Sequence, residues 1–200
     1  DTPGDQNFFS DTRNCLQAAD GAVVVIDAVD GIKVQTEQAW DFAAEFNQPC
    51  VIFINKLDRE RADFSLTFQA ASEILKPKPI ILQLPIGSET EFRGVVDLIS
   101  GKACEYDENG KAQKIEIPVE LQESLDAERE NLIENIAEAD DELVERYLEG
   151  EELTQQELTA ALRKGTLARI FVPVVCGSAT RNIGIDLLMN LIVDALPSPA

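Results

Sequence analysis

Short apolar runs alternate with amphipathic segments over much of this chain, and they define its expected elements. Runs rich in β-branched residues predict strands that are buried on both faces. We expect these strands at Ala22–Asp27, Cys50–Ile54, Ile80–Pro85 and Ile170–Cys176. Segments with helical periodicity follow them, and we expect helices at Thr36–Phe46, Phe64–Leu75 and Ile183–Leu196. Strands that alternate with helices predict an α/β fold with a mostly parallel sheet.

The pattern changes between the third and fourth predicted strands. Three short segments there indicate antiparallel strands, at Gly94–Ile99, Lys102–Tyr106 and Gln113–Ile117. Three helical segments follow, at about Val119–Ala139, Asp141–Glu149 and Thr154–Ala168, and the last begins with a T-x-x-E capping box. We therefore predict an α+β subdomain at residues 88–169, inserted between two portions of the α/β domain, residues 1–87 and 170–200.

The charge supports this division of the chain. The 200 residues carry a net charge of −20, of which −13 lies in residues 88–170. Such an acidic surface repels a phosphate backbone, so we expect no direct binding of nucleic acid. Histidine is absent, which excludes Ser-His and Cys-His nucleophile pairs within this chain.

The chain has no apolar run that could span a membrane, and its start does not resemble a signal peptide. We expect a cytoplasmic protein. The sequence opens at Asp1 without a methionine and enters a motif at once, so we expect it to be part of a longer protein.

Asn55-Lys56-Leu57-Asp58 is the most informative motif, because it directly follows a predicted buried strand. Ligands of open α/β sheets bind at the carboxyl ends of the strands. A carboxylate at Asp58 can accept two hydrogen bonds from guanine, N1–H and the exocyclic amine, which adenine does not offer. The stem of Lys56 can lie over the base, and Asn55 can join neighbouring loops. The motif predicts a guanine pocket.

Two weaker motifs gain weight from their positions. The first is Asp1-Thr2-Pro3-Gly4, which has the form D-x-x-G. In P-loop nucleotide hydrolases the aspartate of such a motif holds Mg²⁺ through water, and the glycine lets a backbone amide approach the γ-phosphate. Asp107-Glu108-Asn109-Gly110 has the same D-x-x-G form, but we assign it to a hairpin turn. Gly177, Ser178 and Ala179 follow the last predicted strand, and such small residues would let backbone amides approach the guanine carbonyl.

Taken together, these segments resemble the translational GTPases, a family of P-loop NTPases, and within it the elongation factor G branch. The resemblance covers essentially the whole chain. It depends on DTPG, AADGAVVVIDAVDGIKVQTEQAW, NKLDR, QLPIG, YLEGEELTQQEL, VPVVCGSA and LPSPA. It implies GTP and GDP as ligands, Mg²⁺ as cofactor and the ribosome as partner of the intact protein. It also implies that residues 88–169 contact the ribosomal stalk protein. Class 3 release factors and ribosomal protection proteins are alternative branches.

The sequence departs from the family pattern at two places. The phosphate-binding loop G-x-x-x-x-G-K-[ST] is absent from these 200 residues, so we expect this chain alone to bind GTP very weakly and to be inactive. The family reads DTPGH, whereas Asp5 stands here in place of the histidine that positions the attacking water. We therefore expect an intact protein that hydrolyses GTP slowly and drives translocation or recycling. The alternatives are a GTP-binding regulator with little hydrolysis and an acidic protein-binding module.

Overall fold

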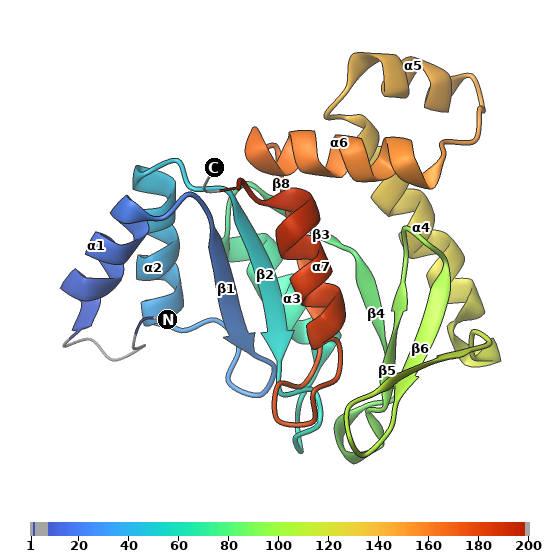
Figure 1. The fold of residues 1–200 in the computed structure, drawn as a ribbon, viewed down its shortest axis with the longest axis horizontal. Coiled ribbons are helices and arrows are strands. Elements are labelled where there is room, and N and C mark those ends of the chain that lie inside the picture. The colour runs from blue at the N-terminus through green and yellow to red at the C-terminus, as the bar shows by residue number, and fades with distance from the viewer. Residues whose placement is uncertain (1, 3–7, 199–200) are drawn as a thin grey trace.

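A computed structural model describes Thr2 and residues 8–198 of the chain. Its elements follow in the order α1 (Phe9–Ala18), β1 (Ala22–Asp27), α2 (Val34–Glu45), β2 (Cys50–Asn55), α3 (Phe64–Ile74), β3 (Lys78–Ile81), β4 (Gln83–Ile86), η2 (Glu89–Glu91), β5 (Gly94–Asp97), β6 (Lys102–Tyr106), β7 (Ala112–Ile115), η3 (Val119–Leu121), α4 (Gln122–Ala137), α5 (Asp141–Leu148), α6 (Gln155–Leu167), β8 (Phe171–Cys176) and α7 (Ile185–Ala195). Figure 1 shows how they are arranged.

The first sheet is parallel and has the strand order β1-β2-β8-β3. Its central strands, β2 and β8, are buried along almost their whole length, because helices cover both faces. Figure 1 shows α7 in front of this sheet and α3 behind it. The predicted α/β fold with a parallel sheet is confirmed, and the carboxyl ends of β1, β2 and β8 meet at one edge.

The predicted strand Ile80–Pro85 is wrong, because two strands take its place. β3 belongs to the parallel sheet, whereas β4 begins a second, antiparallel sheet of order β4-β5-β6-β7. The chain changes sheets at Leu82, whose amide donates to Val174 O (2.9 Å) and whose carbonyl accepts from Leu98 N (2.9 Å). The second sheet therefore begins at Gln83, five residues before the first residue of the predicted insertion.

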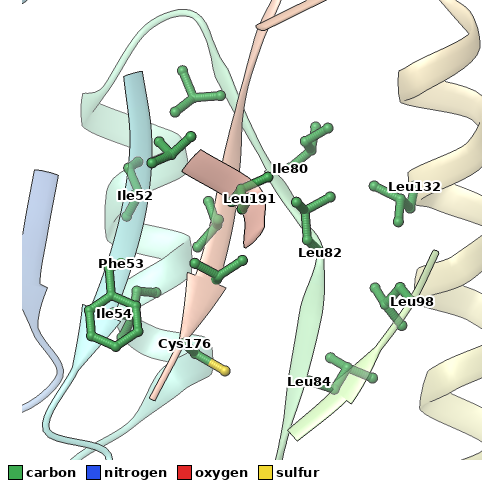
Figure 2. Packing of buried hydrophobic residues seen from close by; sticks show 14 of the residues in the cluster. Ile52, Phe53, Ile54, Ile80, Leu82, Leu84, Leu98, Leu132, Cys176 and Leu191 are labelled. Atoms are coloured by element: carbon green, nitrogen blue, oxygen red, sulfur yellow. The ribbon is translucent and has the colours of Figure 1, made fainter. Parts of the chain in front are cut away.

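The two sheets share one apolar core. Figure 2 shows side chains of the parallel sheet and α7 on one side of Leu82, and Leu98 and Leu132 on its other side. Leu98 directly follows β5 and Leu132 lies in α4, and both are at most 3% exposed. Helix α6 packs closely on the parallel sheet, because a Cβ atom at Gly165 would lie 2.2 Å from the ring of Phe171. The second sheet and its helices are thus firmly attached to the first.

Helix α1 was not predicted from the sequence. It packs against α2, the helix that follows β1. The ring of Phe9 lies 5.9 Å from that of Phe42, and Arg13 forms an ion pair with Glu45. The side chain of Gln48 closes the end of α1, because its Nε2 donates to two carbonyls there. No helix in the described part of the chain is long and apolar enough to cross a bilayer.

The capping box at the start of α6 should make the folded state sensitive to acid. Glu157 accepts hydrogen bonds from Arg146 Nη1 (2.5 Å) and Thr154 N (2.8 Å). These bonds lower the pKa of Glu157 to about 2, and the bond from Arg146 has the largest effect. A carboxylate whose pKa is lower when folded stabilises the fold above its unfolded pKa, and this stabilisation is lost as pH falls through the folded pKa. We expect the urea concentration at the midpoint of unfolding to decrease as the pH is lowered from about 4.5 to about 2. This decrease should be smaller in Glu157→Gln than in the wild type.

Glu116→Gln is the matched control, because Glu116 is an exposed glutamate with no side-chain hydrogen bond among the described residues. Its pH dependence should follow that of the wild type. Equal pH dependence for Glu157→Gln and Glu116→Gln would contradict the assignment of this acid sensitivity to the capping box.

Candidate nucleotide-binding site

The predicted guanine motif lies at the carboxyl end of β2, in the loop that connects it to α3. Asn55 is the last residue of β2 and pairs with Asp27 at the end of β1. Its side-chain Oδ1 accepts from the amide of Lys56 (2.8 Å) and from the amide of Ala179 (2.9 Å). Asn55 therefore joins the loops after β2 and β8.

Asp58 has a carboxylate that is almost enclosed. Its side chain is 11% exposed, and Oδ1 is fully buried with no hydrogen-bond partner among the described residues. The guanidinium of Arg59 reaches only to 3.9 Å from the other oxygen, Oδ2. A buried acceptor without a partner costs free energy, on the order of 1–3 kcal/mol or more when charged. Asp58 thus has a buried acceptor whose hydrogen-bonding capacity the described residues leave unused.

Lys56 crosses the same edge of the sheet. Its Nζ lies 2.5 Å from Asp27 Oδ2, and its backbone is left-handed, with φ of 67°. Non-glycine residues rarely adopt this conformation, and it is concentrated at functional sites. Burial raises the pKa of Asp27, but hydrogen bonds from Lys56 and the amides of Val29 and Asp30 outweigh that effect and lower it. The lowered pKa keeps Asp27 charged, and its carboxylate holds the ammonium group of Lys56.

Gly177, Ser178 and Ala179 begin the loop after β8 and lie against Asn55–Leu57. Gly177 receives the amide of Leu57 on its carbonyl (3.3 Å) and donates its own amide to Ile54 O (3.0 Å). Ser178 is fully buried and exchanges two backbone hydrogen bonds with Ile183, each 3.0 Å long. The backbone amides of all three residues already donate hydrogen bonds within the protein, that of Ala179 to the Asn55 side chain. A guanine carbonyl that approached the Ala179 amide would therefore share this donor with Asn55.

The structure therefore brings six of the predicted residues together at one edge of the sheet: Asn55, Lys56, Asp58, Gly177, Ser178 and Ala179. The other three, Asp1, Gly4 and Asp5, lie outside the described residues. Within Thr2 and residues 8–198, no cluster of three or more carboxylates, cysteines or histidines could hold a metal ion.

Asp27 is a further residue of the candidate site, through its ion pair with Lys56, and it was not among the residues predicted from the sequence. It is the last residue of β1, as Asn55 is the last residue of β2. The rule that ligands bind beyond the carboxyl ends of parallel strands applies equally to both positions. A search for polar residues at the end of every predicted strand would have found it.

The chain is similar to known GTP-binding proteins along nearly its whole length. Residues 1–198 match the family described as "Elongation factor Tu GTP binding domain". Elongation factor G of Thermotoga petrophila is 43% identical over 201 aligned residues, and that of Thermotoga sp. strain RQ2 is 42% identical. Each alignment covers 100% of this chain but only 29% of the relative.

A crystal structure of a protein from Thermus thermophilus has the same fold, with a TM-score of 0.91 and 35% sequence identity. The match covers 100% of this chain and 30% of the other. The chain thus spans less than a third of the length of the relatives it matches. Because the family match covers nearly every residue, this chain belongs to the elongation factor Tu GTP-binding-domain family of translational GTPases, and it is similar to elongation factor G.

Proposed function

We propose that the edge of the sheet formed by Asn55, Lys56, Asp58 and the Gly177–Ala179 loop binds the guanine base of GTP and GDP. The observation that carries this proposal is the buried Oδ1 of Asp58, which has no partner among the described residues. Guanine presents two donors, N1–H and the exocyclic amine, to one carboxylate. Adenine has no proton on N1, so it would leave the acceptor unpaired, and a site built around such a pair rejects the wrong base strongly.

The remaining groups of the site suit a planar base. The apolar stem of Lys56 can cover one face of the ring while its Nζ stays on Asp27. Asn55 fixes the distance between the two loops through Ala179. A pocket whose walls are already held in place binds with less loss of conformational freedom.

The residues that would bind the phosphates of the nucleotide are proposed from the sequence alone. Asp1 would hold Mg²⁺ through water and Gly4 would let a backbone amide approach the γ-phosphate, as in related P-loop NTPases. Bound Mg²⁺ would neutralise charge that develops on the phosphates. We propose that the full-length gene product hydrolyses GTP on the ribosome in the cytoplasm, during translocation or recycling. Residues 88–169 would form an inserted subdomain that contacts the ribosomal stalk protein.

A second candidate function follows from Asp5. A carboxylate near the γ-phosphate repels it and cannot position water as a histidine does. A GTP-binding regulator with little hydrolysis would need the guanine pocket described above but not a fast chemical step. This chain alone is expected to bind GTP very weakly, because it contains no phosphate-binding loop.

Hydrolysis measured with ribosomes tests both candidates. The full-length gene product should convert GTP, and not ATP, to the diphosphate, and Asp5→His should raise the rate at least roughly 100-fold, as expected for a group that positions or activates the nucleophile. Slow hydrolysis that Asp5→His does not accelerate would favour the regulator. Fast hydrolysis by the wild type would show that Asp5 is tolerated. Equal use of ATP and GTP would contradict the guanine site.

A further inference from the structure

The loop between β8 and α7, residues 177–184, makes two hydrogen bonds to connections of the second sheet that are far away in sequence. Arg181 Nη1 donates to the carbonyl of Phe92 (2.7 Å), and Asn182 Nδ2 donates to the carbonyl of Gly110 (3.2 Å). Just beyond the loop, the hydroxyl of Tyr106 donates to Asp186 Oδ1 (2.5 Å). Figure 1 shows this loop and the hairpin of β6 and β7 at the same end of the molecule.

The loop after β2 is attached to the same part of the chain. The amide of Arg61, three residues after Asp58, donates to Glu89 Oε1 of η2 (2.8 Å). Glu89 lies in the connection between β4 and β5, close in sequence to Phe92. Both loops that flank the proposed guanine pocket are therefore held by residues 89–110.

The loop after β8 should transmit a displacement as a unit. Ser178 and Ile183 pair through two backbone hydrogen bonds, and Ser178 Oγ accepts from the amide of Arg181 (3.3 Å). Arg181 is thus connected to Ser178 and, through the adjacent Ala179, to the Asn55 side chain. The second sheet and the pocket are linked by a short series of contacts.

The hydrogen bond from Tyr106 to Asp186 is the most enclosed of these links. Tyr106 is 7% exposed, whereas Arg181 and Asn182 lie on the surface. Burial and the neighbouring carboxylate of Asp186 raise the pKa of Tyr106, so its hydroxyl stays protonated and remains a donor. Asp186 lies in the first turn of α7, which directly follows the loop.

We propose that Tyr106 and Arg181 are positioning residues, which hold the loop after β8 against the guanine base and so set the rate at which GDP leaves. The proposal rests on the proposed guanine site. It assigns to the second sheet a control over nucleotide release, since any partner that pulls on the β6–β7 hairpin would act on the pocket through these contacts.

Release of GDP labelled with methylanthraniloyl on its ribose, measured by stopped flow on the full-length gene product, tests the proposal. Tyr106→Phe removes one hydroxyl and should speed release roughly 10-fold, because a hydrogen bond to a charged group is lost. Arg181→Ala should speed release as well. Tyr147→Phe is the matched control, since the Tyr147 hydroxyl makes no hydrogen bond among the described residues, and its release rate should stay within roughly 2-fold of the wild type.

A double-mutant cycle separates positioning from general destabilisation. Tyr106→Phe, Asp186→Ala and the double variant should release GDP at the same raised rate, because each removes the same contact. Additive effects, or wild-type release rates in Tyr106→Phe and Arg181→Ala, would overturn the proposal.

Hydrogen exchange without nucleotide distinguishes failure of this proposal from failure of the guanine site. The peptide covering residues 177–184 should exchange faster in Tyr106→Phe than in Tyr147→Phe. If the wild type does not bind GDP, both the guanine site and the control of GDP release are contradicted. Faster hydrogen exchange of residues 177–184 in Tyr106→Phe would still establish that the second sheet holds this loop. Unchanged exchange overturns the positioning role itself.

Discussion

Asp58→Asn in the full-length gene product is expected to weaken binding of GDP at least roughly 100-fold. The carboxylate would accept two hydrogen bonds from guanine, and each hydrogen bond to a charged group is worth about 1.5–3 kcal/mol. An amide has one accepting and one donating atom, so it would direct an N–H against the exocyclic amine of the base. Competition against labelled GDP gives the affinity directly.

The base itself provides the control for this experiment. Xanthine carries a carbonyl where guanine carries the amine, so the amide of Asp58→Asn can donate to it while still accepting from N1–H. Xanthosine diphosphate should therefore bind the variant more tightly than GDP, and the wild type should show the reverse order. If Asp58→Asn keeps the wild-type order of GDP, xanthosine diphosphate and ADP, then Asp58 does not recognise the base.

The parallel sheet could be predicted because its central strands, β2 and β8, are buried on both faces, whereas β1 is buried only at Ile26. A strand covered on both sides needs a continuous apolar run, and β2, with five consecutive buried residues, is such a run. The motif after β2 could be placed in space for the same reason, since the end of a buried parallel strand fixes the edge at which the next residues lie.

The division of Ile80–Pro85 into two strands could not be predicted from periodicity. Ile80, Leu82 and Leu84 are all buried and apolar, so the pattern continues unbroken while the chain passes from one sheet to the other. Which partner strand each residue joins depends on contacts with β8 and β5, which are distant in sequence. Apolar runs define burial, but they do not define the sheet.

Helix α1 was missed because most of its surface is polar, with only Thr12 buried. Its position depends on aromatic and ionic contacts to α2 and on the side chain of Gln48 rather than on a strong apolar face. The contacts of Tyr106 and Arg181 with the pocket region were equally hidden, because each joins residues that are 80 or more positions apart.

Gly177→Ala is expected to destabilise the fold and weaken binding of GDP together. A Cβ atom at this position would lie 2.2 Å from the carbonyl oxygen of Ile183 and 3.0 Å from the ring of Phe53. Neither can yield easily, because Ile183 O accepts the amide of Ser178 and Phe53 is 1% exposed within β2. Overpacking of this kind costs about 1–3 kcal/mol, and sometimes more. Urea denaturation measures the loss of stability.

Gly21→Ala gives the matched control for that substitution. Gly21 also has an ordinary backbone conformation, but the nearest atoms to its added Cβ lie at 3.3 Å, and two of them belong to side chains near the end of the chain. It should therefore lose much less stability and keep its affinity for GDP. Relief of the Gly177→Ala clash requires Gly177 to move away from both Ile183 and Phe53, which would disturb the nearby hydrogen bond from Ala179 to Asn55. A Gly177→Ala variant with wild-type stability and wild-type GDP affinity would show that the loop after β8 is free to move without effect on the base. That result would contradict the tight packing of Gly177 against Ile183 and Phe53.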